Sequence, residues 1–244
     1  MHVRLLTVPA LAAVLLAPTG VAAAAAQRPE GLVAAPTRSV AHVARIVAPV
    51  IALTAPATGK FKIRLGTQAF WGRGENQLLV LASRHDSRGR TWLKVLLPVR
   101  PNGSVGWIPR DRTLIGSTHW RIVVSTGQRK VRVYHDGRLA RSFLAVVGAP
   151  GTPTPHGHYA IYEKIAQRDP QSIIGPWALH LTAYSRVLHS YDGGPGRIAL
   201  HGRAGGLLAD PLGSARSHGC VRMSSRFVAW LARRVRPGVP VEIR

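Results

Sequence analysis

The sequence predicts a mainly β protein. Its apolar residues fall mostly in short runs between Gly- and Pro-rich turns, as strands do, and a single stretch over 224–236 has the spacing of an amphipathic helix. At 244 residues the chain can bury a substantial core without disulfides. We expect two β-rich regions, over 46–116 and 117–244, and find no internal repeat.

The N-terminal segment 1–26 has the features of a secretory signal peptide. Arg4 precedes an uncharged stretch over 5–26 that is apolar at first and ends in small residues. Cleavage after Ala24 or Ala26 would fit the A-x-A-like rule; an uncleaved membrane anchor is the alternative. We therefore expect an exported protein of the periplasm or cell wall, with a linker over 27–45.

The charge balance is strongly basic. Lys and Arg number 33 against 10 Asp and Glu, a formal net charge of +23. Such a charge attracts polyanions. Because export makes nucleic acid the least expected polyanion, anionic cell-wall polymers are the expected partners of this charge, with anionic lipid as an alternative. Genomic base composition is the alternative origin of the arginine bias.

Residues 46–116 predict a small β module. LLVLAS (78–83) and TWLKVLLPV (91–99) have strand composition, and VGWIP (105–109) follows a turn with an Asn-Gly pair. Four or five such strands would make a small barrel. The stretch from 92 to 108 resembles the bacterial Src-homology-type barrels that accompany cell-wall enzymes. An irregular β-rich extension of the main domain is the alternative.

The second region continues the β pattern from Trp120. Val131 and Val133 alternate with polar residues, and Asp136-Gly137 predicts a hairpin turn. Ser224 or Ser225 would cap the helix, which Pro237-Gly238 would end, and VPVEIR would close the region as a strand. We therefore expect few helices here.

Cys220 is the only cysteine of the chain, within SARSHGCVRM (214–223). An unpaired cysteine in an exported protein suggests a reactive thiol. His201, at the end of an apolar strand, could serve as its base, and the turn of His218 and Gly219 could direct N–H groups at an oxyanion. Arg222 adds a cation suited to a carboxylate, and neighbouring positive charge predicts a lowered thiol pKa.

Two other interpretations of Cys220 are weaker. A buried, inert thiol is uncommon directly after His-Gly in a polar loop. A zinc site of His201, His218 and Cys220 lacks the usual Cys-x-x-Cys or paired His spacing. We therefore expect no metal.

The motifs around Cys220 resemble those of the L,D-transpeptidases, the YkuD-type catalytic domain. IALHG (198–202) followed by SHGCVRM (217–223) is similar to that family's active-site signature. The stretches over 133–164, with its Thr-Pro-x-Gly loop, and 175–202 are similar to the family's preceding segments. The resemblance covers about residues 120–244 and implies a YkuD-like β-sandwich catalytic domain with few helices.

The resemblance also implies roles for individual residues. Cys220 would be the nucleophile and His201 the general base, oriented by the backbone of Gly202; His218 and Gly219 would shape the oxyanion site. The residues expected to contact substrate are Arg222, Ser217, Tyr184 and Trp177, although core packing is an equal alternative for the last two. Arg203-Ala204 and His156 depart from the family's usual residues, which leaves substrate selection open.

The expected activity is L,D-transpeptidation of peptidoglycan stem peptides. The resemblance implies a thioester on Cys220, release of D-alanine, and a cross-link between third residues of two stems, with no cofactor and with acylation by carbapenems. An L,D-carboxypeptidase, with water as acceptor, and a non-catalytic wall-binding protein are the alternatives. We expect a monomer.

Overall fold

The computed structural model describes residues 31–169 and 171–244. The predicted signal peptide and the first residues of the linker lie outside this part of the chain. Within it, no helix has the length and apolar character needed to cross a membrane.

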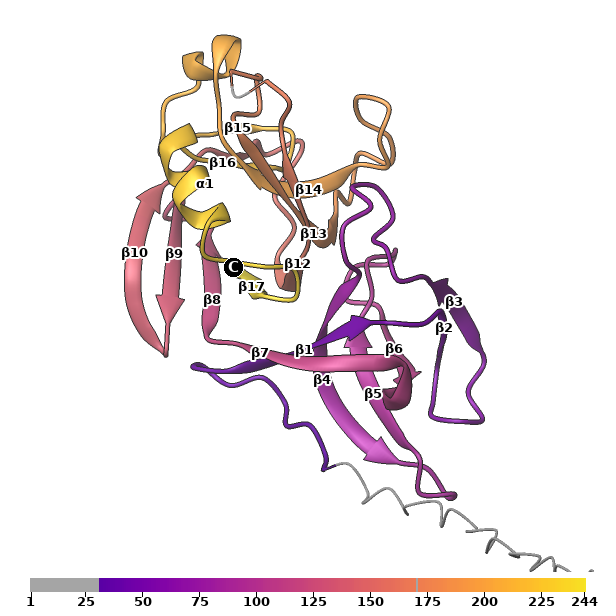
Figure 1. Cartoon of the computed structure of the whole chain (residues 1–244). Coiled ribbons are helices and arrows are strands. Elements are labelled where there is room, and N and C mark those ends of the chain that lie inside the picture. Colours follow the sequence, from indigo (N-terminus) through magenta and orange to yellow (C-terminus); the bar gives the residue numbers. More distant parts are fainter. Residues whose placement is uncertain (1–30, 170) are drawn as a thin grey trace, which may run out of the picture. The chain divides into compact units, whose positions relative to one another are not determined.

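Seven strands form a sheet from the first β-rich region (Figure 1). They are β1 (Ala41–Ile46), β2 (Val50–Leu53), β3 (Phe61–Leu65), β4 (Gln77–His85), β5 (Thr91–Leu96), β6 (Val105–Pro109) and β7 (Thr113–Thr118). The order is β3-β2-β6-β5-β4-β1-β7, with a short 3-10 helix, η1 (Arg110–Arg112), before β7. These pairings leave β3 and β7 as edge strands, and closure into a small barrel stays a prediction.

Strand β1 begins at Ala41, inside the segment expected to be a linker. It pairs with β4 and, over its whole length, with β7. Ala44 and Ile46 alternate into the core of the first sheet, whereas Ala41, on the opposite face of the strand, belongs to a second buried cluster. The extended chain before β1 is therefore shorter than the sequence predicts.

The second sheet has eight strands in the order β10-β9-β8-β17-β12-β13-β14-β16. Its strands are β8 (Trp120–Ser125), β9 (Lys130–His135), β10 (Arg138–Leu144), β12 (Gly157–Ala166), β13 (Trp177–Tyr184), β14 (Arg197–His201), β16 (Val221–Arg222) and β17 (Pro240–Ile243). A two-stranded parallel pair, β11 (Val147–Gly148) with β15 (Ala215–Ser217), leads into the cysteine turn. The mainly β prediction is confirmed.

Strand β17 lies in the middle of this sheet. It pairs in parallel with β8 and antiparallel with β12, so residues 240–243 join the two halves of the sheet. The VPVEIR segment therefore forms the predicted strand, and it does so at the centre and not at an edge.

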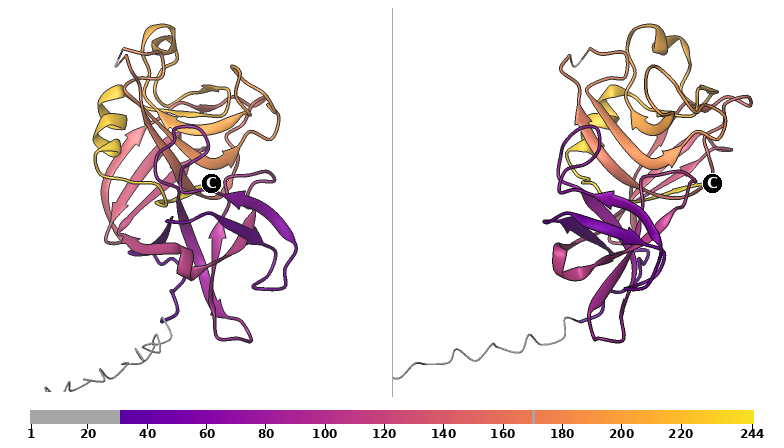
Figure 2. Two further views of the ribbon diagram at one scale, coloured as in Figure 1. Left: turned by 45° about the vertical axis from the view of Figure 1, so that its right-hand side comes forward. Right: turned by 90° about the vertical axis from the view of Figure 1, so that its right-hand side faces the viewer.

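The helix α1 (Ser225–Ala232) packs on one face of the second sheet, and Figure 2 shows it in yellow from two further sides. Ser224 caps it, because its hydroxyl accepts the N–H of Phe227 at 3.4 Å. Val228 and Leu231 are buried in the core that the sheet and helix share. The predicted helix is confirmed, but it ends at Ala232, four residues before the end of the predicted stretch at Arg236.

The two sheets share side chains and hydrogen bonds. Tyr162, on β12, is buried within the core of the first sheet. The hydroxyl of Tyr184, on β13, donates to the carbonyl of Pro98 at 2.6 Å, and Asn102 makes two 2.8 Å hydrogen bonds to the Tyr184 backbone. The first sheet is therefore hydrogen-bonded to the strands that carry the site described next.

Candidate active site

Cys220 lies in the turn between β15 and β16. Gly219 has φ +113°, a left-handed conformation, and a Cβ there would meet Cδ1 of Ile198 at 3.0 Å. The hydroxyl of Ser217 donates to the Cys220 carbonyl at 2.5 Å and accepts the Gly219 N–H at 3.1 Å. Thr154 donates to the Gly219 carbonyl at 2.8 Å. These hydrogen bonds give the turn one conformation.

The same bonds assign roles to two predicted residues. Ser217 is fully buried and contacts the turn itself, so its place is structural and not in contact with substrate. The N–H of Gly219 is already bonded to Ser217, which leaves Gly219 the task of shaping the loop.

The thiol of Cys220 is neutral at pH 7. Burial raises its pKa, and this outweighs the backbone of Ala199 and the positive charges of Arg222 and Arg197, which lower it. The expectation of a lowered pKa is therefore wrong, because the sequence shows the neighbouring cations but not the burial. The thiol hydrogen points to the Arg197 carbonyl, at an Sγ–O distance of 3.8 Å.

His201 ends β14 and is 5% exposed. On this strand Ile198 and Leu200 enter the core, so alternation places Arg197, Ala199 and His201 on the opposite face. The parallel pairing of β14 with β16 sets His201 opposite Arg222, and Leu200 opposite the residue that follows Cys220. Strand register thus brings the predicted base to the cysteine turn.

The ring of His201 has a defined tautomer. Nδ1 lies 2.6 Å from the carbonyl oxygen of Gly202, and a carbonyl only accepts, so Nδ1 carries the hydrogen and Nε2 is the basic atom. Burial lowers the pKa of His201 to about 4; the Gly202 carbonyl opposes this and Arg222 adds to it. The imidazole is therefore neutral at pH 7. A Cβ at Gly202 would lie 2.8 Å from Oγ of Ser225, so only glycine fits.

A cavity of about 440 Å³ contains both groups. Besides Cys220 and His201, its lining residues are Ile173, Ile174, Ser185, Leu188, Tyr191, Asp192, Gly196, Arg197, Leu207, His218 and Arg222. Apolar and polar side chains thus surround one thiol and one neutral imidazole. This is the arrangement that a nucleophile and general base require.

His218 and Tyr191 form one exposed wall of this cavity. The Tyr191 hydroxyl lies 3.2 Å from Nδ1 of His218, and the two rings are 5.0 Å apart. His218 was predicted, whereas Tyr191 was missed; its signal was the Gly-rich loop YDGGPG ahead of the strand that ends at His201.

Arg222 lines the cavity but its charge is paired. Its guanidinium donates to Asp210 at 2.7 Å, and the side chain is 7% exposed. The carboxylate of Asp210 therefore compensates the cation that was expected to meet a substrate carboxylate. Asp210 gave no motif signal in the sequence.

Trp177 and Tyr184 do not line the cavity. Tyr184 is buried against Pro98, and Trp177 packs against the core with Lys164 5.5 Å from its ring centroid. Both side chains therefore pack in the core, as the alternative interpretation predicts.

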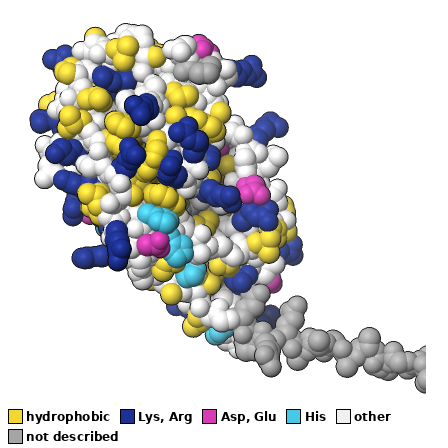
Figure 3. All heavy atoms as spheres, turned by 60° about the vertical axis from the view of Figure 1, so that its left-hand side comes forward, with side chains coloured by type: hydrophobic (Ala, Val, Ile, Leu, Met, Phe, Trp, Pro, Cys, Tyr) yellow, Lys and Arg dark blue, Asp and Glu magenta, His cyan; other side chains and the backbone are white. Residues whose placement is uncertain are grey.

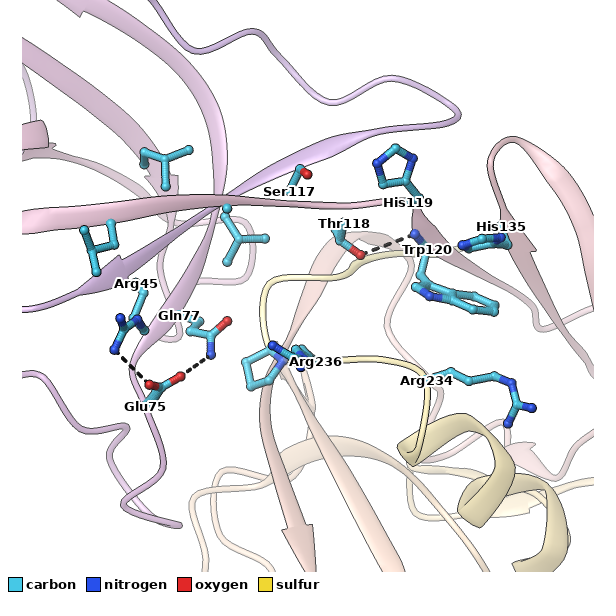
Figure 4. Close-up of a pocket in the computed structure, with 15 residues that line it drawn as sticks. Arg45, Glu75, Gln77, Ser117, Thr118, His119, Trp120, His135, Arg234 and Arg236 are labelled. Atoms are coloured by element: carbon cyan, nitrogen blue, oxygen red, sulfur yellow. Dashed lines mark hydrogen bonds and ion pairs between the residues drawn. The ribbon is translucent and has the colours of Figure 1, made fainter. Parts of the chain in front are cut away.

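A second cavity, of about 470 Å³, contains neither Cys220 nor His201 (Figure 4). In it Arg45 and Gln77 both point to Glu75, at 2.9 and 2.8 Å. In the part of the chain that is described, no three His, Cys, Asp or Glu residues are grouped as metal ligands. The chemistry predicted for the thiol therefore belongs to the first cavity.

Comparisons with known proteins agree with the motifs. The L,D-transpeptidase catalytic domain, YkuD, matches residues 119–243. A Bacillus licheniformis protein with the provisional name L,D-transpeptidase YkuD is 27% identical over 161 residues, which are 63% of this chain and 87% of that protein.

Solved structures of L,D-transpeptidases are also similar. L,D-transpeptidase 3 of Mycobacterium tuberculosis aligns with 69% of this chain and 91% of its own at 17% identity and a TM-score of 0.42. An Enterococcus faecium L,D-transpeptidase aligns with 51% of this chain at 22% identity and a TM-score of 0.36, and this chain covers 49% of its length. On the strength of the sequence match over 119–243, this chain belongs to the L,D-transpeptidase family with a YkuD-type catalytic domain.

Proposed function

We propose that this chain is an exported enzyme that cross-links peptidoglycan stem peptides through a thioester on Cys220. The observation that supports this most directly is the pairing, in one cavity, of the only thiol with an imidazole whose Nε2 is basic. The export rests on the N-terminal sequence pattern.

The protonation states favour general-base catalysis over a preformed ion pair. With a neutral thiol and a neutral His201, the proton passes to Nε2 as Sγ attacks the carbonyl carbon of the third stem residue. The S–C bond forms and the carbonyl electrons move to oxygen. The Gly202 carbonyl, on Nδ1, stabilises the imidazolium that results.

Collapse of this intermediate breaks the peptide bond to the terminal D-alanine. The imidazolium returns its proton to the leaving amine, and the acyl group remains on Cys220 as a thioester. The amine of a second stem then attacks the thioester carbon while His201 accepts its proton, which passes to the departing thiolate. Water in place of the amine would give the L,D-carboxypeptidase reaction.

The basic surface suits residence in an anionic cell wall. The chain has a net charge of +23, and Figure 3 shows Lys and Arg side chains spread over one face among few acidic ones. No cofactor or metal enters the steps above.

Mass spectrometry tests the proposal. Incubation with a tetrapeptide-stem fragment should release D-alanine and add the tripeptide acyl mass to the peptide that contains Cys220. Adding a second stem should yield a cross-linked dimer, whereas D-alanine release with no dimer would indicate the carboxypeptidase. Absence of both products with a folded protein would favour a non-catalytic wall-binding role.

A further inference from the structure

The loop between β3 and β4 reaches from the first sheet to Glu163 on β12. The backbone N–H groups of Trp71 and Gly72 donate to Oε1 of Glu163 at 2.8 and 2.9 Å. The Glu163 side chain is 3% exposed. A buried carboxylate requires such partners, so this loop and β12 fix each other's positions.

The other oxygen of Glu163 holds Arg197. Its Oε2 accepts from Nη1 of Arg197 at 2.7 Å, and the guanidinium carbon lies 3.7 Å from the centroid of a Trp71 ring. The Arg197 side chain is 11% exposed. We call Trp71, Glu163 and Arg197 the arginine clamp; a salt bridge and a cation–π contact hold the guanidinium on two sides.

Arg197 connects this clamp to the thiol. It lines the cavity of Cys220, lies on the same face of β14 as His201, and accepts the thiol hydrogen with its backbone carbonyl. The residue thus contacts Cys220 through its backbone while its side chain is held by Glu163 and by Trp71 of the β3–β4 loop.

We propose that Arg197 is a positioning residue for Cys220 and that the β3–β4 loop, through Trp71 and Glu163, is a functional part of the active site. The loop fixes both the Arg197 carbonyl, which accepts the thiol hydrogen, and the Arg197 guanidinium, whose charge lies beside the thiol. This inference rests on Cys220 as the reactive thiol of the proposed function, and it assigns the first sheet a role in the reaction itself.

Other titratable groups also line the cavity of the thiol. His201, His218, Arg222, Tyr191 and Asp192 line the same cavity. Asp210 pairs with Arg222, as Glu163 does with Arg197, and the neighbouring His180 is kept neutral by burial, with a pKa of about 3. Both arginines are therefore compensated, so removal of one partner changes the local charge by one unit.

The pH profile of Cys220 alkylation by iodoacetamide tests the clamp without any stem peptide. Glu163→Gln leaves Arg197 uncompensated and should move the profile to lower pH, by about one unit. Arg197→Gln should move it to higher pH, and the double variant should return it toward the parent. Mere loosening would expose the thiol and move all three variants to lower pH, so a same-direction shift, or none, overturns the proposal.

A second pair of variants separates the indole from the loop. Trp71→Leu removes the ring over Arg197 but keeps the backbone N–H to Glu163, and it should slow acylation by a tetrapeptide-stem fragment about tenfold. Phe70→Leu, in the same loop, touches Trp71 and Tyr162 but not Arg197, and should change the rate less than about twofold. Equal effects of the two would contradict the clamp.

Folding and the proposed function are checked separately. Thermal unfolding is measured for each variant. If Arg197→Gln does not fold, Arg197→Lys is used in its place; because it keeps the positive charge, it should keep the pH profile of the parent. A parent protein that is alkylated but never acylated by stem peptides would end the proposed function, while the opposite shifts of the two single variants would still support the clamp.

Discussion

On one side of Cys220, strand β14 holds His201 buried, with its Nδ1 fixed by a 2.6 Å hydrogen bond. On the other side, the cysteine turn holds His218 exposed, with Tyr191 as its partner at 3.2 Å. Proton transfer needs a fixed tautomer and a defined pKa, which burial in a strand provides. Substrate contact needs an accessible side chain. We therefore propose that His201 transfers the proton and that His218 contacts substrate, according to their surroundings.

The largest effect is expected from Cys220→Ser, because it removes the proposed nucleophile on which both histidines would act. A serine hydroxyl is far less acidic than a thiol, and His201 with a pKa of about 4 is too weak a base to activate it. Acylation by a stem fragment should fall to background in mass spectrometry. Thermal unfolding should match the parent; residual acyl transfer would mean that another nucleophile acts.

A comparison of His201→Ala with His218→Ala measures directly how the proposed roles of the two histidines differ. Loss of the general base should lower the acylation rate constant by about 10²–10⁴. Loss of His218 should act mainly on KM, because an exposed wall residue contacts substrate and not the transferred proton. Single-turnover acylation at several donor concentrations separates the two constants. Equal losses in the rate constant would contradict the division.

Acid should destabilise the protein through its buried histidines. The folded-state pKa values of His201 and His180 are lowered from 6.5 to about 4 and about 3. Each is neutral when folded but binds a proton when unfolded, so stability is full above pH 6.5 and falls as pH drops toward 4. For His201 the loss is of the order of 3 kcal/mol.

Urea unfolding at pH 7 and pH 4.5 checks this. His201→Asn should reduce the difference in free energy of unfolding between the two pH values. The matched control is His189→Gln, at an exposed position, which should leave the difference as in the parent. A parent equally stable at both pH values would show that His201 is not held neutral by burial.

The smallest effect is expected from Tyr191→Phe, which tests the hydrogen bond between Tyr191 and the exposed His218. It removes the hydroxyl at 3.2 Å from His218 but keeps the ring contact. An exposed hydrogen bond contributes about 1 kcal/mol or less, so KM should rise about two- to fivefold with an unchanged rate constant. A larger fall in the rate constant would place Tyr191 in the chemistry.

The sequence identifies the candidate residues of this site better than it predicts their environment. Cys220, His201 and the turn residues lie in short motifs, and the mainly β class follows from local patterns of apolar residues. Burial of the thiol depends on the packing of distant segments, so the sign of its pKa shift could not be predicted.

Long-range partners were missed for the same reason. Glu163 meets Arg197 across 34 residues, and Asp210 meets Arg222 through a loop without a motif. Trp177 and Tyr184 were misassigned because composition does not tell which way a strand aromatic faces.

The central position of β17 has a consequence for folding. In the strand order of this sheet, residues 240–243 lie between β10-β9-β8 and β12-β13-β14-β16, and they pair with β8 across most of the catalytic region. Contacts of such high sequence separation have a large loop-closure entropy and form late. The pairing of β17 with β8 is therefore expected to form after the local hairpins β8–β9 and β12–β13, whose strands are close in sequence.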